Sequence, residues 1–303
     1  MRLVGEPDTM HVGLIGAGVG PSLSPALHER EARALGLAYR YTLIDLDVLG
    51  VDPEDPAAVG DLLRRARDAG LRGVNVTHPV KQRVLHHLDA LAPDAEAIGA
   101  VNTVVFDEGR AVGHNTDWSG FAAALHDGLP GVAVGRVAVL GAGGAGAAAA
   151  HALLVAGAGE VDLLDVDAER ARDLAGRLGA TFGPGRARAR PVDGIADVLA
   201  AADGLVHATP TGMAEHPGLP VPGELLHPQL WVAEIVYRPL RTALLAAAQA
   251  VGCPTLDGGL MAVHQAADAL HLFTGLRPDA ARMRRHLDDL VAAPDDREDH
   301  RAV

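Results

Sequence analysis

The sequence predicts an α/β fold with two domains, each built on a mainly parallel sheet. Short apolar strands alternate with helices along the chain, which is typical of parallel sheets covered by helices. The alternation begins at His11–Ile15 and starts afresh at Val137–Leu140. A glycine-rich loop follows the second start at once, which predicts a Rossmann dinucleotide-binding domain. A chain of 303 residues is long enough for two such domains.

In the first half, apolar runs predict strands at His11–Ile15, Tyr39–Ile44 and Gly73–Val76. Helices are expected from Pro25 to near Gly36, over Ala57–Ala69, and from Pro79, because proline is well tolerated in the first turn of a helix. A hairpin is expected from Val101–Phe106 and Arg110–His114, which flank a turn containing Gly109. The helix Trp118–His126 then leads to the next domain.

In the second half, strands are expected at Val137–Leu140, Val161–Leu164, Gly204–His207 and Trp231–Ile235. The predicted helices run from the glycine loop to about Ala156, and over Arg170–Leu178, Leu244–Val251 and Gly259–Leu272. These elements divide the chain into a first domain (1–117), a Rossmann domain (118–257) and C-terminal helices (258–291). The acidic, proline-containing segment 292–303 is predicted to be a disordered tail.

Composition excludes several classes of protein. The net charge of −13 and the lack of a Lys/Arg block argue against a nucleic-acid surface. Cys253 is the single cysteine, which rules out an intrachain disulfide and a cysteine metal cluster. No histidine pair has helical spacing with a carboxylate, so no metal site is expected. With neither a signal-peptide pattern nor an apolar run of ~18 residues, the chain is expected to be cytoplasmic and not membrane-bound.

Lysine occurs once, at Lys81, and the other 25 of the 26 lysine and arginine residues are arginines. Arginine replaces lysine as a solvated cation, but its pKa stays above roughly 12, so it does not release a proton at neutral pH. A chain that uses lysine only here is expected to need an amine here. The alternative is a residual surface lysine. Lys81 is the leading candidate for a catalytic acid or base.

Two glycine-rich loops follow predicted strands, and only Gly141–Gly146 has the features of a nucleotide site. A helix begins inside this motif, which would place a pyrophosphate at the positive N-terminus of the helix. Asp165 ends the next strand, where an acid that binds the ribose is expected ~20 residues on. Strand, loop, helix and acid therefore agree.

The other loop, Gly16–Gly20, is followed by Pro21 and Pro25, which prevent a helix from starting inside it. No helix N-terminus is then available for a phosphate. The loop is predicted to present the hydroxyls of Ser22 and Ser24 to a polar ligand. Taken alone, serines beside a proline are more often turn formers.

The turn Leu164–Arg170 (LDVDAER) favours NAD over NADP as cofactor. It has three acids before the first base. A carboxylate accepts hydrogen bonds from the ribose diol of NAD and repels the additional phosphate of NADP. Arg170 could still lie across the adenine face.

Motifs along nearly the whole chain resemble, in order, those of shikimate dehydrogenases. They are Ser22–Pro25 (SLSP), Asn75–Lys81 (NVTHPVK), Gly99–Thr103 (GAVNT), Gly113–Asp117 (GHNTD), Gly141–Gly146 (GAGGAG), Ala208–Met213 (ATPTGM), Tyr237–Thr242 (YRPLRT) and Gly258–Gln265 (GGLMAVHQ). The closest resemblance is to the NAD-preferring quinate/shikimate dehydrogenase branch. The NADP-dependent biosynthetic branch carries an Asn-Arg-Thr-like turn where this chain has Asp165-Val-Asp167.

The resemblance implies reversible oxidation of the C3 hydroxyl of shikimate or quinate, with Lys81 and Asp117 as the catalytic pair at that hydroxyl. It also implies that residues 1–117 bind the substrate and that the C-terminal helices return to this domain. The implied substrate contacts are Ser22, Ser24, Thr77, Asn102, Tyr237 and Gln265. The implied cofactor contacts are Gly141, Gly143, Gly144, Ala145, Gly146, Asp165, Arg170, Thr209, Met213, Gly258 and Met261.

Two other functions are left open: an enzyme acting on an amino analogue of these acids, and a sensor that binds quinate to regulate transcription without turnover. A sensor is expected to lack Lys81 or Asp117, or to carry a basic DNA-binding segment, and the sequence has both residues and no such segment. A folate-pathway dehydrogenase of similar plan does not match Ser22-Leu-Ser24 or Asn102. The preferred acid and a homodimeric state are also left open.

Overall fold

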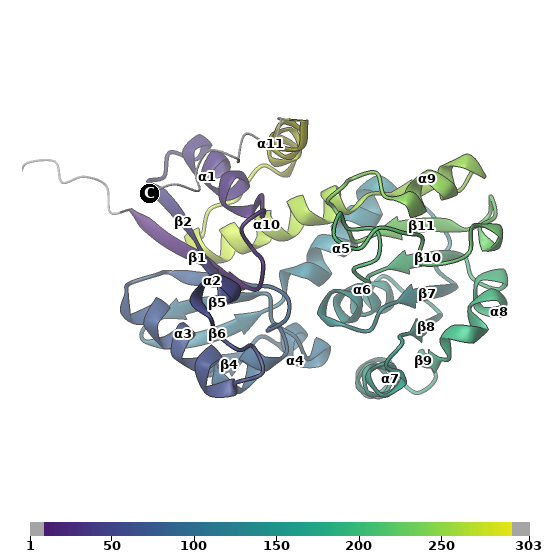
Figure 1. The fold of residues 1–303 in the computed structure, drawn as a ribbon, viewed down its shortest axis with the longest axis horizontal. Helices are drawn as coiled ribbons and strands as arrows, with labels where there is room; N and C mark the ends of the chain where they lie inside the picture. The colour runs from purple at the N-terminus through teal and green to yellow at the C-terminus, as the bar shows by residue number, and fades with distance from the viewer. Residues whose placement is uncertain (1–8, 293–303) are drawn as a thin grey trace, which may run out of the picture.

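The computed structural model describes residues 9–292, which form two α/β lobes side by side (Figure 1). The lobe from the first half of the chain holds a six-stranded sheet in the order β2-β1-β3-β5-β6-β4. Its strands are β1 (Met10–Gly16), β2 (Tyr39–Asp45), β3 (Gly73–Val76), β4 (Ala90–Leu91), β5 (Thr103–Asp107) and β6 (Arg110–His114). Strands β1, β2 and β3 run parallel, and β5 and β6 form the predicted antiparallel hairpin.

Four α-helices and one 3-10 helix belong to this lobe. They are α1 (Ser24–Ala34), α2 (Leu46–Leu49), α3 (Pro56–Asp68), α4 (Pro93–Ile98) and the 3-10 helix η1 (Arg83–His87). Helix α1 has proline in its first turn, as predicted. The apolar side of α3, including Val59 and Leu63, packs on Val74 and Val76 of the central strand β3. This packing holds the end of β3, and with it the segment that carries Lys81.

The prediction that a helix begins at Pro79 was wrong. Residues 77–82 form turns, and the 3-10 helix begins only at Arg83. The carbonyl of Lys81 accepts a hydrogen bond from the amide of Val101, 2.9 Å away, and the amide of Leu85, which a helix would direct to it, donates to the carbonyl of Gln82 instead. A contact distant in sequence thus overrides the local preference, and it fixes the backbone of Lys81 against the start of the hairpin.

The second lobe is a Rossmann domain, as predicted, with six parallel strands in the order β12-β11-β10-β7-β8-β9. Its strands are β7 (Arg136–Leu140), β8 (Glu160–Leu164), β9 (Ala187–Arg190), β10 (Gly204–His207), β11 (Trp231–Glu234) and β12 (Thr255–Leu256). Its helices are α6 (Gly144–Val155), α7 (Ala168–Phe182), α8 (Ile195–Ala200) and α9 (Ala243–Ala250), with 3-10 helices η2 (Val192–Gly194) and η3 (Gly223–Leu225). The chain changes direction across the sheet between β7 and β10, and ligands of such sheets bind beyond the strand ends at that point.

Helices α5 (Thr116–Gly128) and α10 (Gly258–Thr274) lie between the lobes (Figure 1). They pack closely at Gly120, where a Cβ would lie 2.7 Å from the backbone nitrogen of Gln265. Helix α11 (Ala280–Ala292) then packs on α1, and Arg282 donates two hydrogen bonds to the buried carboxylate of Glu31, at 2.6 and 2.8 Å. The predicted tail lies outside the described residues, apart from Ala292 at the end of α11.

The strand β9 was not predicted from the sequence. It reads Ala187-Arg-Ala-Arg190, without an apolar run, because it lies at the edge of the sheet. Arg190 pairs with the fully buried Asp162 of β8, with 2.6 Å between Nε and Oδ1. Arg136 of β7 makes an equivalent pair with the same carboxylate from the other side. Ion pairs with Asp162, rather than an apolar run, therefore link β9 to the neighbouring strand.

Buried His28 predicts a specific loss of stability in acid. Its ring lies 4.9 Å from that of Tyr41, and burial lowers the pKa of His28 to about 3. As the pH is lowered from about 6.5 towards 3, the unfolded chain takes up a proton on His28 that the folded chain does not. The free energy of unfolding therefore decreases by roughly 1.4 kcal/mol for each pH unit of acidification from this group. Urea unfolding of wild type and His28→Phe at several pH values measures the difference. Equal slopes for the two proteins would contradict the assignment.

Candidate active site

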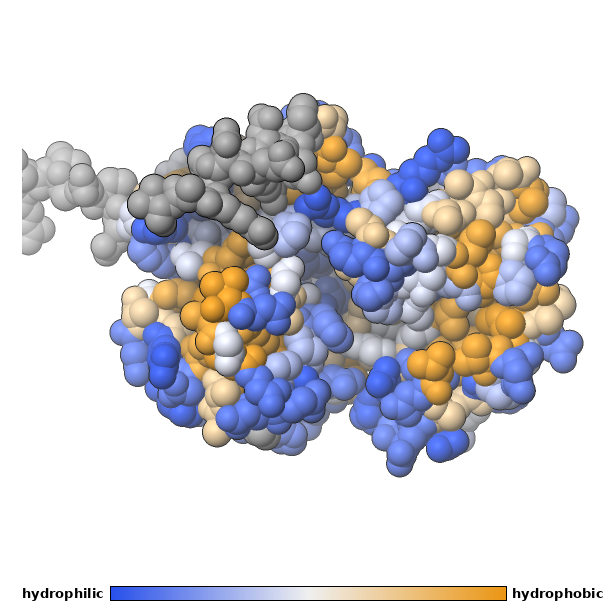
Figure 2. Space-filling view, viewed as in Figure 1, coloured by the Kyte–Doolittle hydropathy of each residue, from blue (hydrophilic) through white to orange (hydrophobic). Residues whose placement is uncertain are grey.

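The catalytic pair predicted from the sequence meets between the two lobes. Lys81, after β3, places its Nζ 2.6 Å from Oδ2 of Asp117, in the first turn of α5, and these side chains are 17% and 8% exposed. Asn115 caps α5 by accepting hydrogen bonds from the amides of Asp117 and Trp118. The carboxylate of Asp117 therefore lies at a positive helix N-terminus, which stabilises its charge. A groove separates the lobes on the face shown in Figure 2.

Asn102 holds the other oxygen of Asp117. Its Nδ2 donates to Oδ1 of Asp117 at 2.9 Å and to Oγ1 of Thr116 at 3.0 Å. Its Oδ1 accepts from the amide of Thr116 and the hydroxyl of Thr103. Both N–H groups and the carbonyl oxygen of this side chain thus have protein partners. Contact between Asn102 and a substrate stays a prediction.

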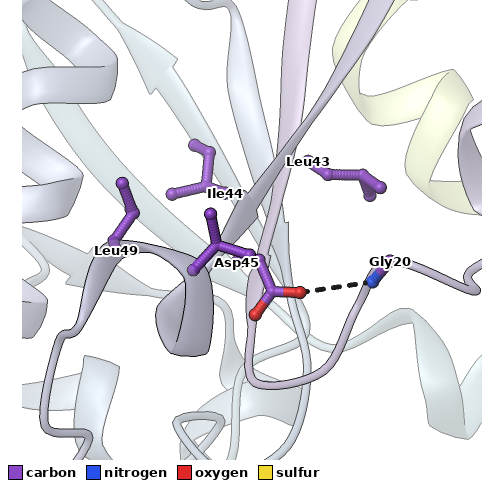
Figure 3. Close-up of a pocket in the computed structure, with 6 residues that line it drawn as sticks. Gly20, Leu43, Ile44, Asp45 and Leu49 are labelled. Carbon is purple, nitrogen blue, oxygen red and sulfur yellow. Dashed lines mark hydrogen bonds between the residues drawn. The ribbon is translucent and has the colours of Figure 1, made fainter. Parts of the chain in front are cut away.

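The loop Gly16–Gly20 is held by the carboxylate of Asp45. The carboxylate of Asp45 accepts hydrogen bonds from the amides of Gly18 and Gly20, and Figure 3 shows it pointing at Gly20. The hollow beside these residues is otherwise lined by the apolar side chains Leu43, Ile44, Val48 and Leu49. A carboxylate among apolar groups repels a phosphate, which agrees with the prediction that this loop is not a nucleotide site.

The same loop brings Ser22 next to the other lobe. Ser22 accepts a hydrogen bond from the amide of Ser24, and it lies near enough to the phenol of Tyr237, which follows β11, to lower the pKa of that phenol in part. Burial raises the pKa of the Tyr237 phenol, so it remains a neutral donor. Two of the predicted substrate contacts, far apart in sequence, therefore lie together across the two lobes.

Thr77 and Gln265 complete the predicted substrate set. The amide of Thr77 donates to the carbonyl of Ile15, which holds Thr77 beside the serine-bearing loop. Gln265 lies on α10, and its backbone carbonyl accepts from the hydroxyl of Thr116, at the start of the helix that carries Asp117. The side-chain amide of Gln265 donates to the carbonyl of Ala262. The C-terminal helix α10 thus reaches the turn that carries Asp117.

The glycine loop of the Rossmann domain fits a dinucleotide phosphate and contacts Lys81 directly. A Cβ at Gly146 would lie 1.8 Å from the carbonyl oxygen of Gly141, so the tight turn needs glycine. Gly143, at the N-cap of α6, has no side chain to cap the first-turn amides and has open space around it. A Cβ at Gly144 would lie 3.1 Å from Cδ of Lys81. The predicted phosphate site, which includes Ala145, and the predicted catalytic amine are therefore neighbours.

Asp165 supports this loop from the end of β8. Its Oδ2 accepts from the amide of Ala142 at 2.7 Å and its Oδ1 from the amide of Asp167 at 2.9 Å. Arg170 forms ion pairs with both acids, at 3.5 Å to Asp165 and 3.2 Å to Asp167. Asp167 also caps α7. The turn thus contains two carboxylates and one partly exposed guanidinium, and their contact with the ribose end of a dinucleotide stays a prediction.

The buried pair His207 and Glu234 holds Thr209 beside the glycine loop. Glu234 accepts from the ring of His207 at 2.8 Å, and the opposite ring nitrogen lies 2.5 Å from Oγ1 of Thr209. His207 and Glu234 are register partners at the ends of β10 and β11. A Cβ at Gly141 would lie 3.1 Å from Cγ2 of Thr209, so the two segments touch. Thr209 therefore lies against the loop where the sequence predicted a cofactor contact.

The remaining predicted cofactor residues lie around α10 and after β10. Met213 is partly exposed, and its backbone forms an isolated antiparallel β-bridge with His216. Gly258 starts α10, and a Cβ there would lie 2.5 Å from the carbonyl oxygen of Ile235, so close packing requires glycine. Met261 is buried in the core of the Rossmann domain. The structure gives Gly258 and Met261 packing contacts, and their contact with a cofactor stays a prediction.

Several contact residues of this site were missing from the sequence analysis. Asn115 precedes Thr116-Asp117 and carries a helix N-cap signal that a search for caps would find. Tyr41, Thr103 and Glu234 gave no such signal, because only strand register brings them to the site. In the part of the chain that the structure covers, no three His, Cys, Asp or Glu side chains gather as metal ligands do, and no helix is long and apolar enough to cross a membrane.

Two family models match the chain. Residues 14–104 match the shikimate dehydrogenase substrate binding domain, and residues 114–219 match the C-terminal domain of alanine dehydrogenase/PNT. The two matches correspond to the two lobes.

Named relatives cover nearly the whole chain. The shikimate dehydrogenase (NADP(+)) of Streptomyces avermitilis is 63% identical over 284 residues, which are 94% of this chain and 97% of that protein. The quinate/shikimate dehydrogenase (NAD(+)) of Corynebacterium efficiens is 45% identical over 278 residues, 91% and 97% of the two chains. The solved structure of quinate dehydrogenase from Corynebacterium glutamicum in complex with NAD superposes with a TM-score of 0.86 at 44% identity, covering 93% of this chain and 99% of that chain.

Sequence, fold and relatives agree on the kind of chemistry. The two-lobed α/β architecture, the Rossmann domain and the motif set are those of oxidoreductases that use a nicotinamide dinucleotide. The chain belongs to the shikimate dehydrogenase family.

Proposed function

We propose that this chain is an NAD-preferring dehydrogenase that reversibly oxidises the C3 hydroxyl of shikimate, quinate or both. The observation that carries the proposal is the position of Lys81, whose Nζ is 2.6 Å from Asp117 and whose stem contacts Gly144 of the glycine loop. A proton-transferring amine therefore lies beside the loop that fits a dinucleotide. Acceptance of the hydride is the chemistry that a bound nicotinamide supplies.

In the proposed mechanism Lys81, as a neutral amine, takes the proton of the C3 hydroxyl, and as an ammonium it returns the proton in the reverse reaction. Asp117 accepts a hydrogen bond from Lys81 and orients Nζ toward the hydroxyl. Such a positioned acid or base contributes ~10²–10⁴-fold to a rate. Arginine elsewhere in the chain cannot perform this step, which explains why lysine is retained here.

The substrate is proposed to lie between the serine-bearing loop and α10. Ser22, Ser24, Thr77, Tyr237 and Gln265 supply hydroxyl and amide groups for its carboxylate and ring hydroxyls. The nearness of Ser22 and Tyr237 supports this placement, because it brings polar groups of both lobes to one point. A polyhydroxylated acid needs many such neutral partners.

The preference for NAD is proposed from the charges of the turn after β8. Asp165 and Asp167 present two carboxylates, which repel an additional phosphate on the ribose. Arg170 is the nearby cation, and it is paired with both acids. The named relatives include an NADP(+) and an NAD(+) enzyme, so the choice has to be made by experiment.

Initial rates of NAD⁺ and NADP⁺ reduction with shikimate, quinate and an amino analogue test the proposal. We expect reduction of NAD⁺ with shikimate or quinate, and a higher kcat/KM for NAD⁺ than for NADP⁺. Calorimetric titration of the same acids is the companion measurement. Binding of an acid without reduction of either cofactor would refute the enzyme and favour the sensor. Turnover of the amino analogue alone would show that this analogue, and not shikimate or quinate, is the substrate.

A further inference from the structure

A chain of buried hydrogen bonds connects Asp117 to Tyr41 on the edge strand β2. The hydroxyl of Tyr41 (β2) donates to Oδ1 of Asn75 (β3) at 2.9 Å. Nδ2 of Asn75 donates to Oγ1 of Thr103 (β5) at 2.9 Å. Thr103 donates to Oδ1 of Asn102 at 3.1 Å, and Asn102 donates to Asp117 at 2.9 Å. All five side chains are buried.

Two backbone groups fix the direction of every bond in this chain. The amide of Thr116 donates to one end of the Asn102 side chain at 2.7 Å, so that end is the oxygen and Nδ2 faces Asp117. Because an amide oxygen cannot donate, Thr103 must give its proton to Asn102. The backbone carbonyl of Asn102 accepts from the Asn75 side chain at 3.3 Å, so the nitrogen of Asn75 faces Thr103 and its oxygen faces Tyr41.

It follows that every donor points toward the carboxylate of Asp117. Asn75 and Thr103 are register partners in adjacent strands, which places their side chains in contact. Tyr41 ends the chain, and burial raises the pKa of its phenol well above the usual value, so the phenol keeps the proton that it donates. Aligned hydrogen bonds polarise one another, and charge-assisted bonds are the strongest of them.

We propose that Tyr41 is a positioning residue for the catalytic pair, acting on Asp117 and Lys81 through Asn75, Thr103 and Asn102. This inference rests on the proposed function, because it assigns the chain of hydrogen bonds to the step performed by Lys81. The hydroxyl of Tyr41 strengthens the hold of Asn102 on one oxygen of Asp117. The other oxygen is then kept in position for Nζ of Lys81.

Tyr41→Phe removes only the hydroxyl, and Tyr39→Phe is the matched control. Tyr39 lies two residues away on β2 and makes its hydrogen bond with His28, outside the chain. Tyr41→Phe leaves Oδ1 of Asn75 without its donor, so the Asn75 amide is free to turn and the bonds that follow it are loosened; kcat is expected to fall about threefold. KM for the acid is expected to stay within about twofold of wild type, since no group that binds the substrate is removed. Tyr39→Phe is expected to keep the wild-type kcat.

Substitutions at Thr103 interrupt the same chain in the middle. Thr103→Val removes the hydroxyl and is expected to lower kcat at least as much as Tyr41→Phe. Thr103→Ser retains the hydroxyl, so its kcat is expected to equal that of wild type. In the double variant Tyr41→Phe/Thr103→Val, loss of the Tyr41 hydroxyl is expected to have no further effect, because the path to Asp117 is already broken. Melting temperatures of all variants show whether folding is preserved.

Several outcomes would overturn the inference while wild type turns over the acid. They are an equal kcat for the Tyr41→Phe and Tyr39→Phe variants, multiplicative effects of the Tyr41 and Thr103 changes, and a rise in KM at constant kcat. The last would make Tyr41 part of the substrate site. Absence of turnover in wild type would instead refute the proposed function, so the two failures are distinguished by the same assay.

Discussion

Lys81→Ala is expected to lower kcat for the acid and NAD⁺ by ~10²–10⁴-fold, the range of a general acid or base. The side chain is the group within 2.6 Å of Asp117 and beside Gly144, and alanine provides neither a proton acceptor nor a cation there. Binding of the acid in calorimetry is expected to persist, because Ser22, Thr77 and Tyr237 are unchanged. A variant with kcat within threefold of wild type would remove Lys81 from the proposed mechanism.

Lys81→Arg distinguishes a need for positive charge at this position from a need for a group that releases a proton. Arginine keeps a cation next to Asp117 but cannot release a proton at neutral pH, so its kcat is expected to be as low as that of the alanine variant. The larger head group also lies against Gly144, so a melting curve must accompany the kinetics. Activity retained in the arginine variant alone would show that the site needs a charge and not an acid or base.

Asp167→Ser is expected to lower the ratio of kcat/KM for NAD⁺ to that for NADP⁺ by about tenfold. The substitution removes one carboxylate from the turn and releases Arg170 from an ion pair of 3.2 Å. Serine keeps a helix cap, because Asp167 caps α7 by accepting from the amides of Glu169 and Arg170. Less repulsion and a freed guanidinium both favour an additional phosphate.

Glu169→Gln is the matched control for this change. It removes one negative charge from the first turn of the same helix, but Glu169 is exposed and caps nothing. Its cofactor ratio is expected to stay within about twofold of wild type, because the ion pairs of Arg170 with Asp165 and Asp167 are unchanged. Asp165 is unsuitable for the comparison, since it holds the glycine loop through Ala142. A wild type that prefers NADP⁺, with no change in Asp167→Ser, would contradict the proposed role of the acids.

Local sequence patterns determined much of this protein. Alternating apolar strands and helices predicted both sheets, and Gly141–Gly146 after a buried strand predicted the Rossmann domain. The single lysine pointed to Lys81 before any neighbour was known. These signals are local because strand period, helix caps and glycine turns depend on residues a few positions apart.

The tertiary structure decided those features of the site that depend on contacts between segments distant in sequence. The amide of Val101 donates to the carbonyl of Lys81, and residues 77–82 form turns where a helix was predicted from Pro79. Strand pairing joins Tyr41 and Asn75 to the site, although these residues are 34 positions apart. Packing of the lobes brings Ser22 to Tyr237. Hydrogen bonds between distant segments satisfy buried polar groups that no local pattern reveals, so the chemistry of this site depends on the fold as a whole.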